Sequence, residues 1–323
     1  MWSALRDIIG HRKILNRFII SKSKNALSHA YLIVGEDGIG KSLVAKGFAE
    51  IILGIDERES HVDIINYKTN ENSFKISHVR ELVSEVNKKP YEGDKKVIIL
   101  YDGQKMTTEA QNALLKTIEE PPNGVYIIIL TTATEVILDT VKSRCQICKL
   151  TPLGGSDLLE FINRDYKMID ENTKKALIAF SQGIPGRIDK FVNDKGFGIL
   201  RDFVLDVLFA IANRSEKDIL EYTGYFESKS KNQIANVLIG KNDDLLEQFV
   251  SFTRDIILYK EIANESFIIN NDKIEEIQKL ANLMSYKKIK EFVGIIDETR
   301  NNLLSNTNRV LTFNGMMRKM LEA

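Results

Sequence analysis

The stretch from Gly35 to Ser42, Gly-Glu-Asp-Gly-Ile-Gly-Lys-Ser, decides the fold of this chain. It fits the phosphate-binding template of a glycine, four residues, and then glycine, lysine and serine or threonine. The apolar run Tyr31–Val34 precedes it and predicts a strand, and apolar residues follow it at helical spacing over 43–52. A strand, a glycine-rich turn and a helix together form the arrangement that presents backbone N–H groups and a helix N-terminus to phosphate.

Each residue type in this loop has a chemical reason to be there. Gly35, Gly38 and Gly40 allow successive backbone N–H groups to turn toward phosphate oxygens. The ammonium group of Lys41 can reach the β- and γ-phosphates, and the hydroxyl of Ser42 can bind Mg²⁺ when a nucleotide is present. The expected ligand is therefore ATP or ADP with Mg²⁺. The alternatives are a chance turn and a relic loop that binds nothing.

Composition limits the class of protein. The 323 residues favour more than one domain, and the 43% hydrophobic and 28% charged residues are typical of a soluble globular chain. Lys plus Arg and Asp plus Glu both number 45, so the chain as a whole has no basic field for nucleic acid. The presence of only two cysteines argues against a disulfide scaffold, and no run is apolar and long enough to span a membrane. We expect a cytoplasmic protein without a membrane partner.

Aliphatic runs alternate with helical patterns in the first half of the chain. The runs 97–100 and 125–130 predict parallel strands with both faces covered, and 61–65 predicts a further strand. Helices are expected over 78–87 and 109–119. This alternation predicts an α/β domain with a parallel sheet and flanking helices. Asp102 follows one of the strands, at the sheet edge where such domains bind ligands.

The pattern changes after residue 150. Helical segments replace the aliphatic strands, which predicts a small helical lid over 151–200 and an all-α domain over 201–323, after an α/β domain over 1–150. Two apolar stripes at helical spacing are interpreted as core: Leu245, Phe249, Phe252 and Ile256, and Val310, Phe313, Met317 and Met320.

Several blocks resemble the AAA+ clamp-loader subunits of bacterial DNA polymerase III. They are Asn112–Pro122, the triplet Ser143-Arg144-Cys145, His29–Leu32 before the loop, and Gly183–Arg187. The resemblance extends over the whole chain and is greatest to the delta-prime branch of the family. It implies a P-loop AAA+ domain, a helical lid and a C-terminal collar. It also implies a hetero-oligomeric ring with motor-type and delta-type subunits, which acts on the sliding clamp and on primer–template DNA as a component of the DNA polymerase III holoenzyme.

The same resemblance implies roles for four further residues. Arg144 would be an arginine finger that projects to the nucleotide of a neighbouring subunit, where a planar, permanently charged guanidinium stabilises developing phosphate charge. Thr131 and Thr132 would sense the γ-phosphate, and Arg187 would be a second sensor on the lid. The alternative for Arg144 is a surface arginine paired with an acid. For Thr131 and Thr132 it is a strand end made of β-branched residues, and for Arg187 it is a lone arginine without a ligand.

One departure from the family pattern bears on hydrolysis. An active AAA+ ATPase carries Asp-Glu where this chain has either Tyr101-Asp102 or Asp102-Gly103, so one carboxylate is missing. We therefore expect weak or absent ATP hydrolysis by this chain. The alternatives are an ATP-hydrolysing motor subunit of gamma/tau type and an unrelated, stand-alone AAA+ DNA-repair ATPase.

Two minor features receive structural interpretations. Cys145 and Cys148 have the spacing of a metal pair, but zinc needs four ligands and no second pair exists, so no zinc is expected. Many subunits of the family that this chain resembles carry a zinc-binding group of cysteines after the first helix, but residues 51–62 of this chain contain no cysteine. Lysines at 88, 89, 95 and 96 are interpreted as a solvated polar turn, with a contact to a nucleic-acid backbone as the alternative.

Overall fold

The computed structural model describes residues 8–55, 61–69, 71, 73–227, 233–262, 265–305 and 307–323. Over these residues the chain packs as two compact units. The first contains the described residues up to 168 together with 181–186, and the second contains 169–180 and the residues from 187 onward. The three-domain division stays a prediction.

A parallel sheet forms the centre of the first unit. Its strands are β1 (Ala30–Val34), β2 (Ile64–Tyr67), β3 (Lys96–Leu100), β4 (Val125–Thr131) and β5 (Gln146–Lys149). They lie in the order β2-β3-β4-β1-β5, and every neighbouring pair is parallel. The predicted α/β architecture is confirmed, although β2 begins at Ile64 rather than at residue 61.

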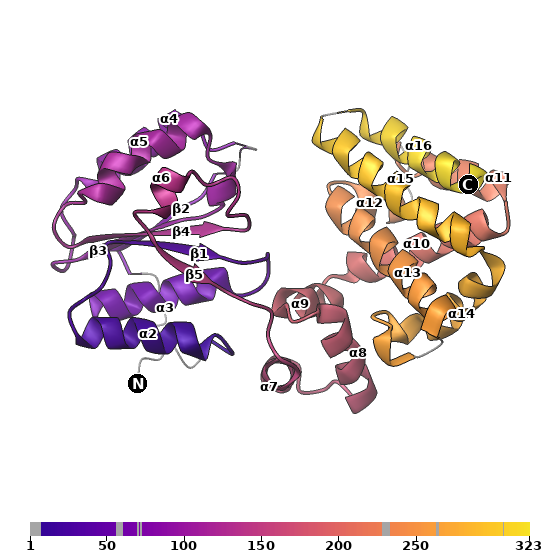
Figure 1. Cartoon of the computed structure of the whole chain (residues 1–323), viewed down its shortest axis with the longest axis horizontal. Helices are drawn as coiled ribbons and strands as arrows, with labels where there is room; N and C mark the ends of the chain where they lie inside the picture. The colour runs from indigo at the N-terminus through magenta and orange to yellow at the C-terminus, as the bar shows by residue number, and fades with distance from the viewer. Residues whose placement is uncertain are drawn as a thin grey trace. The chain divides into compact units, whose positions relative to one another are not determined.

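Helices cover both faces of this sheet (Figure 1). The helices α2 (Arg12–Ser23) and α3 (Lys41–Leu53) pack on one face; α4 (Ile76–Val86), α5 (Thr108–Glu119) and α6 (Asp139–Lys142) lie on the other. Alternate strand residues enter the two cores, as Ile99 packs with α3 while Ile98 packs with α4 and α5. Because both faces are buried, the strands have continuous aliphatic sequences instead of alternating ones.

The interpretation of the lysine-rich segment is wrong for Lys96. Its side chain is fully buried in β3, where Nζ donates to the Glu85 carbonyl at 3.3 Å, to Glu85 Oε1 at 3.2 Å and to the Lys88 carbonyl at 3.1 Å. A buried ammonium needs such partners because the interior cannot hydrate it. Helix α4 also begins at Ile76, earlier than predicted, with Lys75 as its N-cap residue.

The rest of the described chain after β5 is helical. The helices are α7 (Gly155–Asp165), α8 (Glu171–Ser181), α9 (Pro185–Asn193), α10 (Lys195–Ala212), α11 (Glu216–Gly224), α12 (Gln233–Leu238), α13 (Asn242–Ile262), α14 (Ile274–Leu283), α15 (Tyr286–Leu304) and α16 (Arg309–Glu322), with short 3-10 turns at Glu265–Phe267 and Asn271–Lys273. A further 3-10 turn, Gly103–Lys105, follows β3 in the first unit. Both predicted stripes enter one core between these helices, although Val310 is only partly buried. None of the described helices is long and apolar enough to cross a bilayer.

Candidate nucleotide site

The phosphate loop connects β1 to the N-terminus of α3. Gly38 and Gly40 have φ angles of +82° and +104°, in the left-handed region that favours glycine. Among the described residues, no hydrogen bond engages the backbone N–H groups of Gly38, Gly40, Lys41 or Ser42. Free amides at the start of a 13-residue helix form a suitable cradle for a phosphate group.

The side chain of Lys41 folds back onto the loop. Its Nζ donates to the carbonyls of Gly35 at 2.8 Å and Glu36 at 2.9 Å, and to Asp37 Oδ1 at 3.0 Å. The lysine side chain is 11% exposed and that of Asp37 is 84% exposed. An ion pair with such an exposed partner is weak, so a phosphate oxygen can replace Asp37 at small cost.

Thr131 lies directly beside the loop at the end of β4. It pairs with Val34 in the sheet, and its carbonyl accepts the N–H of Gly35 at 3.1 Å. Its buried hydroxyl donates to the Ala133 carbonyl at 2.9 Å, and the N–H of Thr132 donates to Gln104 Oε1 at 3.2 Å. The sheet therefore brings both threonines to the site, but the Thr131 hydroxyl is already engaged by its own turn.

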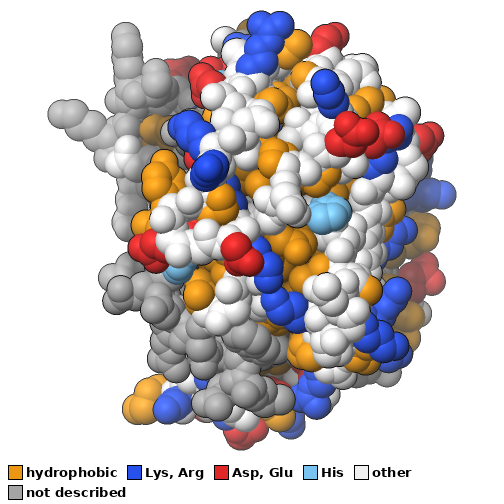
Figure 2. Space-filling model, turned by 90° about the vertical axis from the view of Figure 1, so that its left-hand side faces the viewer, with side chains coloured by type: hydrophobic (Ala, Val, Ile, Leu, Met, Phe, Trp, Pro, Cys, Tyr) orange, Lys and Arg blue, Asp and Glu red, His pale blue; other side chains and the backbone are white. Residues whose placement is uncertain are grey.

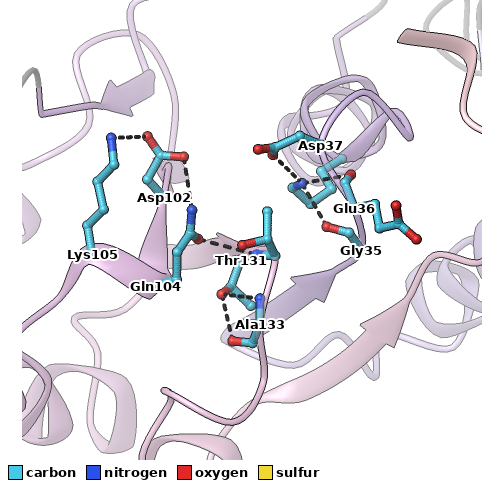
Figure 3. A network of polar contacts seen from close by, with 10 residues as sticks. Gly35, Glu36, Asp37, Asp102, Gln104, Lys105, Thr131 and Ala133 are labelled. Atoms are coloured by element: carbon cyan, nitrogen blue, oxygen red, sulfur yellow. Dashed lines mark hydrogen bonds and ion pairs between the residues drawn. The ribbon is translucent and has the colours of Figure 1, made fainter. Parts of the chain in front are cut away.

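Asp102 lies two residues after β3 and has a left-handed backbone, φ +54°. Its carboxylate accepts Lys105 Nζ at 3.1 Å and Gln104 Nε2 at 3.4 Å. Figure 3 shows this network on one side of Thr131 and the loop residues Gly35 to Asp37 on the other. The preceding Tyr101 hydroxyl donates to Asn66 Oδ1 at 2.9 Å. One carboxylate, paired with an ammonium group, cannot both hold Mg²⁺ through water and orient an attacking water.

Two contacts to the loop were missed by sequence reasoning. The N–H of Gly186 donates to the Gly38 carbonyl at 2.9 Å, which joins the first turn of α9 to the phosphate loop. His11 Nε2 donates to the Ile39 carbonyl at 3.2 Å, and burial lowers the pKa of His11, which favours the neutral ring. The Gly-Ile-Pro-Gly sequence was the available signal for the first contact; a lone histidine gave none for the second.

Arg187 belongs to the second unit and is half-buried in α9. Within that unit, burial raises the pKa of Glu247 on α13, and the positive charges of Arg187 and Lys190 oppose this rise. The electrostatic neighbour of Arg187 inside its own unit is therefore a carboxyl group. Its role as a nucleotide sensor stays a prediction.

Arg144 occupies the exposed turn between α6 and β5. Its Nε–H donates to Glu119 Oε2 at 3.1 Å, and Nη1 donates to the Thr140 carbonyl at 3.1 Å. Since β1 and β5 are parallel, with Tyr31 paired to Gln146, Arg144 precedes the amino end of β5 at the edge opposite the phosphate loop. The five residues of β1 separate these edges by about 15 Å along the strands.

The two cysteines face opposite sides of the sheet. Cys145 packs toward α5 and Cys148 toward α3, and burial raises the pKa of Cys145 to about 12 and that of Cys148 to about 11. Both thiols are therefore protonated at neutral pH. The described residues contain no cluster of three or more His, Cys, Asp or Glu side chains that could hold a metal ion.

Surface charge offers no continuous basic patch on the face shown in Figure 2. Lys and Arg side chains are interspersed there with acidic and apolar ones among the described residues. This mixture agrees with the zero net charge of the sequence. A mixed surface of this kind gives little sequence-independent attraction to a phosphate backbone.

Two family profiles match this chain. The one described as "DNA polymerase III, delta subunit" matches residues 10–154, and the one described as its C-terminal part matches residues 205–320. Together they cover most of the sequence. The chain belongs to the DNA polymerase III clamp-loader family. The residues of this clamp-loader protein outside both matches are 1–9, 155–204 and 321–323.

Curated relatives of this clamp-loader chain carry several different subunit names. DNA polymerase III subunit delta' of Bacillus subtilis is 24% identical over 95% of this chain and 94% of its own length. The gamma subunit of Buchnera aphidicola is 25% identical over 94% of this chain and 92% of its own length. Among solved structures, a gamma-subunit-related protein of Thermotoga maritima covers 94% of this chain and 98% of its own, with a TM-score of 0.53 and 15% identity, which supports the fold.

Proposed function

We propose that this chain is the delta-prime-type subunit of the DNA polymerase III clamp loader. In this role it joins motor-type and delta-type subunits in a hetero-oligomeric ring in the cytoplasm, with residues 201–323 as its collar. The ring loads the sliding clamp on primer–template DNA during replication. Support comes from the match to the delta' relative over nearly the full length of both chains.

The position of Arg144 carries the proposal. The guanidinium lies at the sheet edge opposite its own phosphate loop, about 15 Å away along the strands, so it cannot serve the nucleotide of its own chain. It is exposed and retains N–H donors beyond its contacts with Glu119 and Thr140. We propose that Arg144 acts in trans, as an arginine finger for the ATP site of a neighbouring subunit.

The loop of this chain has the donors for a nucleotide but lacks part of the hydrolytic machinery. The free N–H groups of Gly38, Gly40, Lys41 and Ser42 would hold the phosphates of ATP or ADP, and the Ser42 hydroxyl would bind Mg²⁺. Bound Mg²⁺ would neutralise phosphate charge. The single carboxylate of Asp102, already paired with Lys105, supports slow or absent hydrolysis.

A motor subunit of gamma/tau type is the second candidate. The complete phosphate loop and the similarity to the Buchnera gamma subunit favour it. The two candidates differ in turnover by the isolated chain. A motor subunit hydrolyses ATP at a rate that Lys41→Ala abolishes, whereas a delta-prime subunit has the same background rate with and without this change.

The decisive experiment reconstitutes the loader with the Arg144→Ala variant of this chain. We expect normal assembly, and a fall of at least about tenfold in the ATPase rate of the complex, since fingers supplied in trans contribute 10³ or more in other systems. Arg80→Ala, which removes an exposed arginine on α4, is the control and should leave the rate unchanged. An Arg144→Ala complex as active as wild type would refute the finger.

A further inference from the structure

The guanidinium of Arg144 is held from two directions. Glu119, the last residue of α5, accepts Nε–H at 3.1 Å, and the Thr140 carbonyl in α6 accepts Nη1–H at 3.1 Å. A guanidinium has five N–H donors, so these two contacts leave three free. Contacts from two separate elements fix the plane of the group as well as its position.

The elements that present Glu119 and Arg144 are themselves joined in the interior. Gln111 of α5 is 2% exposed, and its side-chain amide donates to the Val136 carbonyl at 2.9 Å and accepts the N–H of Leu138 at 2.8 Å. Leu114 of α5 and Val141 of α6 are fully buried in the same core. The spacing between the end of α5 and the turn with Arg144 is therefore set by packing.

We propose that Glu119 is a positioning residue for Arg144, which sets the guanidinium in the orientation that receives the phosphate of a neighbouring subunit. This inference rests on the proposed role of Arg144 as a finger in trans. An exposed arginine samples many rotamers, and a carboxylate on Nε removes much of that freedom while it leaves Nη2 open. Glu119 acts only through Arg144 and contacts no nucleotide.

The side chains of Arg144 and Glu119 are 35% and 55% exposed. An exposed ion pair contributes little to folding, so Glu119→Ala should fold and assemble normally. The adjacent Glu120 is also exposed and has no ion pair with a described residue, which makes Glu120→Ala the matched control. The two variants remove the same charge from the same helix end.

The test measures steady-state ATPase of the reconstituted loader with each variant. Glu119→Ala should lower kcat about two- to fivefold, the range that corresponds to an exposed ion pair, with KM within twofold of wild type. Glu119→Gln, which keeps an acceptor oxygen, should retain most of the rate, and Glu120→Ala should match wild type. In an Arg144→Ala background, Glu119→Ala should have no further effect.

Three outcomes would overturn the inference. An increase in kcat would mean that Glu119 withholds the finger, and an equal loss from Glu120→Ala would indicate a general charge effect. A loss that persists in the Arg144→Ala background would show that Glu119 acts elsewhere. If Arg144→Ala alone leaves the rate unchanged, the proposed finger fails and this inference fails with it, an outcome distinct from the other three.

Discussion

The contact between Gly186 and the phosphate loop predicts the cost of adding one methyl group. An alanine Cβ at position 186 would lie 2.5 Å from Gly38 Cα and 3.1 Å from the Gly38 carbonyl oxygen, so the turn must move by about 1 Å. Overpacking of this kind costs about 1–3 kcal/mol, and the same movement weakens the Gly186–Gly38 hydrogen bond. We expect Gly186→Ala to lower the unfolding free energy by about 1–3 kcal/mol.

Thermal unfolding followed by circular dichroism, together with amide hydrogen exchange at position 186, measures this effect. A loss of that size lowers the midpoint by about 3–9 °C in a unit of this length, and exchange at residue 186 should accelerate. Gly198→Ala is the control, because this helical glycine of α10 has no atom within 4 Å of an added Cβ. It should raise stability by up to about 1 kcal/mol. A Gly186→Ala midpoint at or above wild type would refute the reasoning.

Two further predictions concern buried charge. Lys96→Met removes the ammonium that joins β3 to Glu85, and it should lower the free energy of unfolding by about 1–3 kcal/mol in urea unfolding. Lys89→Met, at an exposed lysine of the same lysine-rich segment, is the control and should change this free energy by less than about 0.5 kcal/mol. Equal effects of the two substitutions would contradict the buried network. Burial raises the pKa of Asp63, but hydrogen bonds from the N–H groups of Tyr91 and Glu92 outweigh it, and the net pKa is lowered. The carboxylate therefore stabilises the fold above about pH 4 and loses this contribution as the pH falls further. The midpoint of thermal unfolding of the Asp63→Asn variant should therefore decline less between about pH 5 and pH 3 than that of the wild type. An unchanged decline would contradict this prediction.

The sequence predicted the elements whose signals are local. The glycines of the loop, the aliphatic runs at 97–100 and 125–130, and the two apolar stripes of the helical region each report the conformation or burial of their own segment. The prediction for Lys96 was wrong because its burial depends on Glu85, which lies in α4, and on Lys88, which follows that helix. A lysine that directly follows another lysine carries no local sign that its ammonium lies in the interior.

For the candidate site, too, some features follow from the sequence and others depend on the tertiary structure. The sequence by itself determined that a phosphate loop is present, because this follows from residue identity at fixed spacing. The resemblance to AAA+ ATPases added that one carboxylate of their Asp-Glu pair is missing, at either Tyr101 or Gly103. Only the tertiary structure decided that β5 runs beside β1, which puts Arg144 at the edge opposite its own loop, and that Gly186 meets Gly38. These relations depend on strand order and on the packing of segments far apart in the chain, which residue spacing does not encode.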